Sequence, residues 1–175
     1  MFSLGKRSAA LSNPKVGLLN LRAENAAELV RLDSAFLARL FEAIEVQDSA
    51  VPQCDVLFLY ADIAPGGGVT GSVQGLREII RDSGAKVVVV ASANPPDRYI
   101  KAGAERPYGR ANLVMTLNRR GNSFEHFFTE LFSKMKTGVS MPDAWVQLDP
   151  QVPVCVADSN PETIFACELG ALSFA

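Results

Sequence analysis

Four short apolar runs of strand length recur along the chain, at residues 15–21, 54–60, 86–91 and 111–117. The second and third runs are apolar at almost every position, as expected for strands that are covered on both faces. The third run is also rich in valine, a β-branched residue that favours strands. The pattern therefore predicts buried strands at the centre of a layered protein.

Helical periodicity separates these runs. Residues 24–45 place apolar side chains on one face, and residues 72–82 do the same behind Ser72, a predicted N-cap, with Val73 among the inward positions. A strongly amphipathic helix is expected from residue 122 to Gly138. Its apolar residues are Phe124, Phe127, Phe128, Leu131, Phe132 and Met135.

The remaining segments are expected to be short elements or connections. Ser140 and Asp143 form a reduced capping box for a short helix. Residues 94–110 are expected to be a polar connection with two prolines. Short terminal strands are expected at 152–156, 163–169 and 171–174.

Strands that alternate with helices predict an α/β fold, a three-layer sandwich with a mostly parallel central sheet. The chain of 175 residues has room for one such domain, assigned to residues 15–175 behind a loose leader at 1–14. Ligands of such sheets bind beyond the carboxyl ends of the strands. Those ends are expected at residues 61–62, 92–94 and 118–120.

Composition narrows the classes of function. Hydrophobic residues make up 48% of the chain, which excludes a disordered protein, and a net charge of −2 argues against a nucleic-acid partner. No apolar run approaches the roughly 20 residues of a membrane span, and no signal peptide is recognised, so a cytoplasmic protein without a membrane partner is expected.

Cysteine and histidine usage limits the chemistry further. The three cysteines are expected to be reduced, although pairing of Cys155 with Cys167 stays open. His126 is the single histidine and is predicted to face solvent. One histidine cannot build the common multi-histidine metal sites, and no metal or other cofactor is expected.

A glycine-rich loop at residues 61–71 follows the second strand and precedes a helix. Its glycines can be read as G-x-G-x-x-G, but no lysine precedes Ser72 as a phosphate-binding P-loop requires. The favoured interpretation is a flexible or truncated active-site loop. The backbone amides of Gly67 and Gly68 remain candidate contacts for an anion.

Two basic residues, Arg119 and Arg120, follow the fourth predicted strand directly. Arginine binds carboxylates and phosphates through paired hydrogen bonds, so both residues are candidate anion contacts at the edge of the sheet. The alternative is a solvated loop.

Over residues 54–170 the chain resembles the CHAT branch of the caspase-like α/β fold. The similar segments are 56–68, 86–94, 111–148 and 161–170, in the family's order. The resemblance implies a caspase-like topology and places the family's catalytic histidine and cysteine at Asp62 and Asn94, with Ser92 retained before the latter. Because neither residue supplies thiol-protease chemistry, the resemblance implies a pseudo-protease that binds or assembles with a protein partner.

Two other functions stay open. An enzyme of different chemistry could use Asp62 and Asn94 in the same crevice, with Arg119 or Arg120 orienting a small anionic ligand. A receiver-like or flavodoxin-like signalling domain shares the alternation of strands and helices. A receiver needs clustered acidic residues, however, and no acidic pair follows the first strand at residues 20–22.

Overall fold

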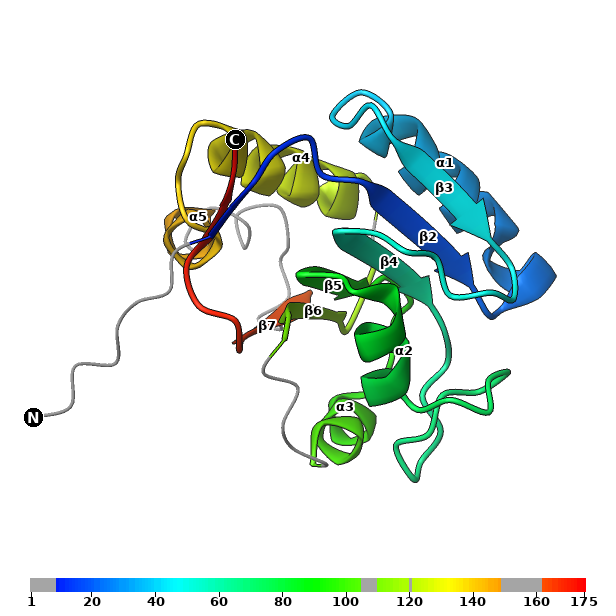
Figure 1. Cartoon of the computed structure of the whole chain (residues 1–175). Helices are drawn as coiled ribbons and strands as arrows, with labels where there is room; N and C mark the ends of the chain where they lie inside the picture. The colour runs from blue at the N-terminus through cyan, green and yellow to red at the C-terminus, as the bar shows by residue number, and fades with distance from the viewer. Residues whose placement is uncertain (1–8, 105–109, 120, 149–161) are drawn as a thin grey trace, which may run out of the picture.

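A six-stranded sheet forms the centre of the protein (Figure 1). The computed structural model describes residues 9–104, 110–119, 121–148 and 162–175. The strand order is β3-β2-β4-β5-β6-β7, and every neighbouring pair is parallel except β6 and β7. The strands are β2 (Val16–Asn20), β3 (Ile44–Gln47), β4 (Val56–Tyr60), β5 (Val87–Val90), β6 (Asn112–Thr116) and β7 (Thr163–Cys167).

Helices cover both faces of this sheet. Helices α1 and α4 lie over one face, and α2 and α3 lie over the other (Figure 1). This confirms the predicted three-layer α/β sandwich with a mostly parallel central sheet. The helices are α1 (Ala27–Leu37), α2 (Leu76–Ser83), α3 (Pro96–Gly103), α4 (Ser123–Lys136) and α5 (Met141–Leu148), with a 3₁₀ turn, η1 (Ala23–Ala26), before α1.

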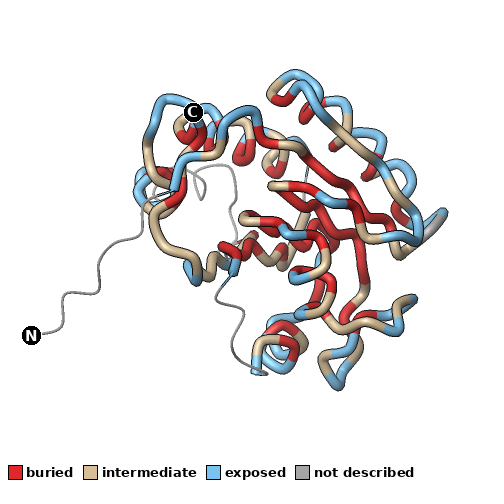
Figure 2. Tube along the Cα trace, viewed as in Figure 1, coloured by how far each residue is buried: buried red, intermediate tan, exposed pale blue. Residues whose placement is uncertain are grey.

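Two apolar cores follow from the alternation of side chains along the strands. Phe58 of β4 points to the α1 and α4 face, where its ring makes edge contacts with Phe36, Phe124 and Phe132. The neighbouring Leu57 points to the second core, under α2 and α3. The central strands are buried along their whole length (Figure 2), which explains their nearly uniform apolar sequence.

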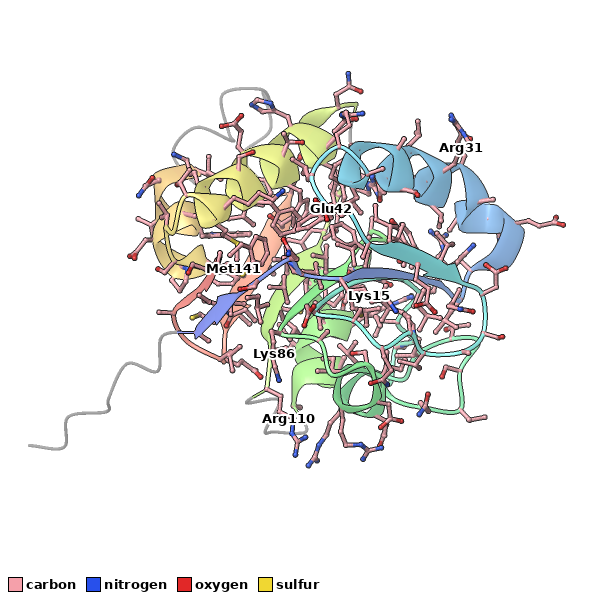
Figure 3. The ribbon with its side chains drawn as sticks, turned by 45° about the horizontal axis from the view of Figure 1, so that its top comes forward. Lys15, Arg31, Glu42, Lys86, Arg110 and Met141 are labelled. Carbon is pink, nitrogen blue, oxygen red and sulfur yellow. The ribbon has the colours of Figure 1, made fainter. Side chains whose placement is uncertain are left out.

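Several charged side chains project outward around the edge of the molecule. Figure 3 shows Arg31 pointing away from α1 and Arg110 pointing away from the start of β6. Both residues are exposed, whereas Met141 at the start of α5 is buried. Among the described residues, the longest helix is α4, and none of the helices is both long and apolar enough to cross a membrane.

Part of the leader expected at residues 1–14 is instead a strand of a second, two-stranded sheet. Residues 9–11 form β1 (Ala9–Leu11), which pairs in parallel with β8 (Leu172–Phe174) near the other end of the chain. Phe174 fixes this pair to the core, because its ring lies 5.7 Å from that of Phe41 and 5.8 Å from that of Phe132. The strand was missed because only three residues form it and its partner is remote in sequence.

The helix expected at 24–45 is shorter than predicted. It ends at Leu37, and Ile44 begins the edge strand β3, which the sequence pattern did not indicate. Between them Phe41 is buried in the core although it lies in a loop. Apolar residues at these positions fit a helical period equally well, and no glycine or proline marks the helix end.

Two further boundaries differ from the predictions. The connection at 94–110 contains α3, which starts with Pro96 in its first turn, where proline is favourable rather than disruptive. Helix α2 starts at Leu76, because Ser72 accepts a hydrogen bond from the Gln74 amide in a tight turn instead of capping a helix. Val73, expected to point inward, is fully exposed. The run at 152–156 lies outside the described residues.

Candidate functional site

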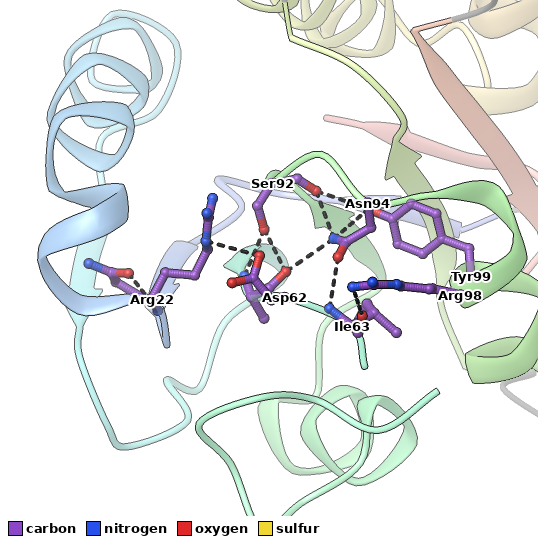
Figure 4. A network of polar contacts seen from close by, with 9 residues as sticks. Arg22, Asp62, Ile63, Ser92, Asn94, Arg98 and Tyr99 are labelled. Carbon is purple, nitrogen blue, oxygen red and sulfur yellow. Dashed lines mark hydrogen bonds and ion pairs between the residues drawn. The ribbon is translucent and has the colours of Figure 1, made fainter. Parts of the chain in front are cut away.

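The carboxyl ends of β4 and β5 lie next to each other and are joined by side chains (Figure 4). The backbone ladder continues one step beyond β5, with the Ala91 amide donating to the Leu59 carbonyl at 2.7 Å. Beyond this step the Ser92 side chain joins the two strands. Its hydroxyl accepts a hydrogen bond from the Ala61 amide at 2.8 Å and donates one to the Ala61 carbonyl at 2.7 Å. The two strand ends are therefore held together after regular pairing stops.

Asn94 extends this connection and is only 3% exposed. Its Oδ1 accepts from the Ile63 amide at 2.7 Å. Its Nδ2 lies within hydrogen-bond distance of the Ala61 carbonyl (3.1 Å), the Ser92 carbonyl (3.0 Å) and the Tyr99 hydroxyl (3.1 Å). Every polar atom of this amide is thus in use. We call Ser92, Asn94 and Tyr99 the strand-tip clasp.

Tyr99 brings a third strand and a helix into the clasp. It comes from α3, and its hydroxyl lies 3.0 Å from the Ser92 carbonyl and 2.9 Å from the Thr116 carbonyl at the end of β6. Burial raises the pKa of Tyr99 well above that of an ordinary tyrosine, so the hydroxyl keeps its proton and remains a donor. The clasp therefore ties β4, β5 and β6 to α3.

Asp62 is the partly exposed group of this site. Its side chain is 47% exposed, and Oδ1 lies 3.1 Å from Nε of Arg22, which follows β2. On the other side, Arg98 of α3 donates to the Ile63 carbonyl at 2.9 Å. Asp62 and Asn94 are therefore close along the edge, but one is in an accessible ion pair and the other is buried within the clasp.

Arg119 lies on the opposite face of the sheet, under α1 and α4, and its guanidinium is already hydrogen-bonded within the protein. Its guanidinium donates to both carboxylate oxygens of Asp33, at 2.9 and 2.7 Å, and to the Ala91 carbonyl at 3.0 Å. It also stacks on the Phe124 ring, with Cζ 3.6 Å from the centroid. Asp33 is buried in α1 and accepts a further hydrogen bond from Tyr60 at 2.7 Å.

This buried group, Asp33, Tyr60 and Arg119, changes the interpretation of Arg119 as an anion contact. A ligand carboxylate or phosphate at Arg119 would have to displace Asp33. Burial, and then the charge of Asp33, raise the pKa of Tyr60, which therefore stays neutral. The second candidate, Arg120, lies outside the described residues.

The glycine loop is a compact turn whose first residues, Ala61 and Ile63, are held by the clasp. The Ala64 amide donates to the Gly68 carbonyl at 2.8 Å, and Ile63 and Val69 form an isolated antiparallel bridge. Gly67 lies against α3, and both Gly67 and Gly68 border a cavity at the start of α2. The structure therefore places the two candidate glycines together on one wall of this cavity.

The groups that could carry nucleophilic or metal chemistry are dispersed. His126 is exposed on α4, as predicted. Cys54, which is buried before β4, and the exposed Cys167 are free thiols, and Cys155 lies outside the described residues. Within the described ranges, no three histidine, cysteine or acidic side chains gather as metal ligands.

Cys54 is expected to be chemically inert in the folded protein. Burial raises the pKa of its thiol from 9.0 to about 12, so at about pH 9 roughly one thousandth of it is the reactive thiolate. Iodoacetamide should therefore alkylate the exposed Cys167 and spare Cys54, as read by mass spectrometry of tryptic peptides. Both thiols should react in denaturant, and equal rates in the folded protein would contradict this burial.

Several residues of the site were not found by sequence reasoning. Asp33 is the one that left a signal, because it is an acidic residue on the apolar face of a helix, next to Val30 and Phe36. A buried acid of this kind requires a partner. Tyr60 and Tyr99 gave no such signal, since tyrosine is common in apolar segments.

No family model matches this chain, and no curated protein matches it.

Proposed function

We propose that this chain is a non-catalytic binding or assembly module, a pseudo-protease on a framework that resembles CHAT and caspase-like domains. In this proposal the positions of the family's histidine and cysteine are held by Asp62 and Asn94. The module acts by binding a protein partner rather than by peptide hydrolysis.

The observation that carries the proposal is the state of Asn94. A thiol nucleophile must be free to approach a substrate carbonyl and must have a base within reach. Asn94 instead has no nucleophilic atom, and its amide hydrogen-bonds Ile63, Ala61, Ser92 and Tyr99. The adjacency of β4 and β5 supports the comparison, because the two positions must come from neighbouring strand ends.

The alternative, an enzyme acting on a small anion at this edge, has less support. Arg119 is bound to Asp33, and Arg22 is paired with Asp62. An anion in the crevice would therefore compete with carboxylates that the protein already supplies.

Labelling with a peptide acyloxymethyl ketone, an electrophile that reacts with protease thiols, tests the proposal. We expect no labelling that is coupled to peptide cleavage, as read by intact mass and a fluorogenic peptide library. Labelling of Cys54, Cys155 or Cys167 together with peptide cleavage would overturn the pseudo-protease interpretation.

The framework itself is tested by rebuilding the missing pair. The double variant Asp62→His, Asn94→Cys should react with the electrophile faster than the single variant Asn94→Cys, because an imidazole at the neighbouring strand end would promote thiolate formation. Circular dichroism checks that both variants fold. Equal rates in two folded variants would show that these positions do not form a protease-like pair.

A further inference from the structure

A cavity of about 240 Å³ lies between the glycine loop and the helices of the α2 and α3 face. It is lined by the glycines at 66–68, by the first turn of α2 and by Lys101 and Ala102 of α3. Its volume is below the roughly 300–1,000 Å³ of sites for drug-sized ligands. The cavity therefore suits a small ion or a small polar group.

The glycines leave backbone rather than side chains along one wall. Gly67 has φ of +90°, and a Cβ there would lie 2.8 Å from the Ala102 nitrogen, so only glycine lets the loop rest on α3. A Cβ on Gly66 or Gly68 would meet no atom within 4 Å. These two positions are open and exposed, so a ligand can approach the loop closely there.

Two cations from different helices border the same cavity. Arg77 comes from α2 and Lys101 from α3, and neither forms an ion pair within the described part of the chain. The next arginine of α2, Arg81, is paired with Asp82. The one carboxylate of the lining, Glu78, already accepts the Gly75 amide at 2.6 Å.

We propose that this cavity binds a small phosphoryl oxyanion, either inorganic phosphate or the phosphate of a monoester. Arg77 and Lys101 supply the charge, and the open glycine backbone lets the ion approach closely. The N-terminus of α2 is not the main source of attraction for the anion, because the Glu78 carboxylate already caps it. The inference does not rest on the proposed function, since no residue of the strand-tip clasp takes part.

Titration of the ¹⁵N-labelled chain with inorganic phosphate at constant ionic strength tests this site. We expect saturable shifts of the amides at 66–68 and 75–77, and a matching dissociation constant by calorimetry. Arg77→Gln and Lys101→Met should each weaken binding about tenfold or more, the usual effect of losing a charge-assisted hydrogen bond. The control variants Arg31→Gln and Lys134→Met remove cations from helices on the other face and should bind as the native chain does.

Gly68→Asp gives a second, independent variant. Its side chain starts in open space, so the fold should persist, while its carboxylate should abolish phosphate binding by repulsion. Thermal melting checks the fold. Non-saturating shifts spread over all surface cations, or unchanged affinity in Arg77→Gln and Lys101→Met, would overturn the proposal.

Discussion

Replacement of Arg119 by methionine is expected to lower the free energy of unfolding by about 3–5 kcal/mol. The substitution leaves the Asp33 carboxylate inside the protein, where its side chain is 2% exposed, and among the described residues only the Tyr60 hydroxyl remains as a partner. It also removes the donor to the Ala91 carbonyl and the cation stacked on Phe124. Urea unfolding followed by circular dichroism measures the change.

A double variant separates two contributions to the loss of stability, the buried charge left without a partner and the lost packing. The double variant Asp33→Leu, Arg119→Met should be more stable than Arg119→Met alone, because no charge is then left buried without a partner. Arg39→Met breaks the exposed pair with Glu125 and is the matched control, for which little change is expected. If both arginine variants lost the same stability, the buried pair would have no special role.

Asn94→Ala is expected to cost about 3 kcal/mol, the second largest effect. It leaves the buried Ile63 amide without its acceptor and deprives the carbonyls of Ala61 and Ser92 of a donor. Each buried polar group that loses its partner costs about 1–3 kcal/mol. Chemical denaturation at constant pH gives the value.

Asn122→Ala provides the control for Asn94→Ala. Asn122 precedes α4, is exposed, and makes no capping hydrogen bond through its side chain. Its replacement should leave the denaturation midpoint almost unchanged. A similarly small effect of Asn94→Ala would mean that water replaces the clasp at no cost, and the assignment of Asn94 as a structural residue would be wrong.

The sequence predicted the central sheet because its strands have an unambiguous pattern. Runs such as 54–60 and 86–91 are apolar on both faces, and only burial between two layers explains that composition. The strands at the edges of the two sheets were harder to predict. β3 and β1 are short and partly exposed, so their sequences carry little periodicity, and their positions depend on partners that are remote along the chain.

The adjacency of the two strand ends was predicted from the sequence, but the interactions of the side chains there were not. Asp62 and Asn94 were placed at adjacent strand ends because parallel strands present their carboxyl ends along one edge. The pairing of Arg119 with Asp33 joins residues 86 positions apart, and no local pattern reveals such a contact. The role of Tyr99 was missed because the helix that carries it was interpreted as a polar connection.

The peptide groups that follow β5 accept hydrogen bonds from side chains on both faces of the sheet. Arg119 binds the carbonyl of Ala91 on one face, and Asn94 and Tyr99 engage the carbonyl of Ser92 on the other. Hydrogen bonds to two successive carbonyls of this short stretch therefore connect the α1 layer with the α3 layer.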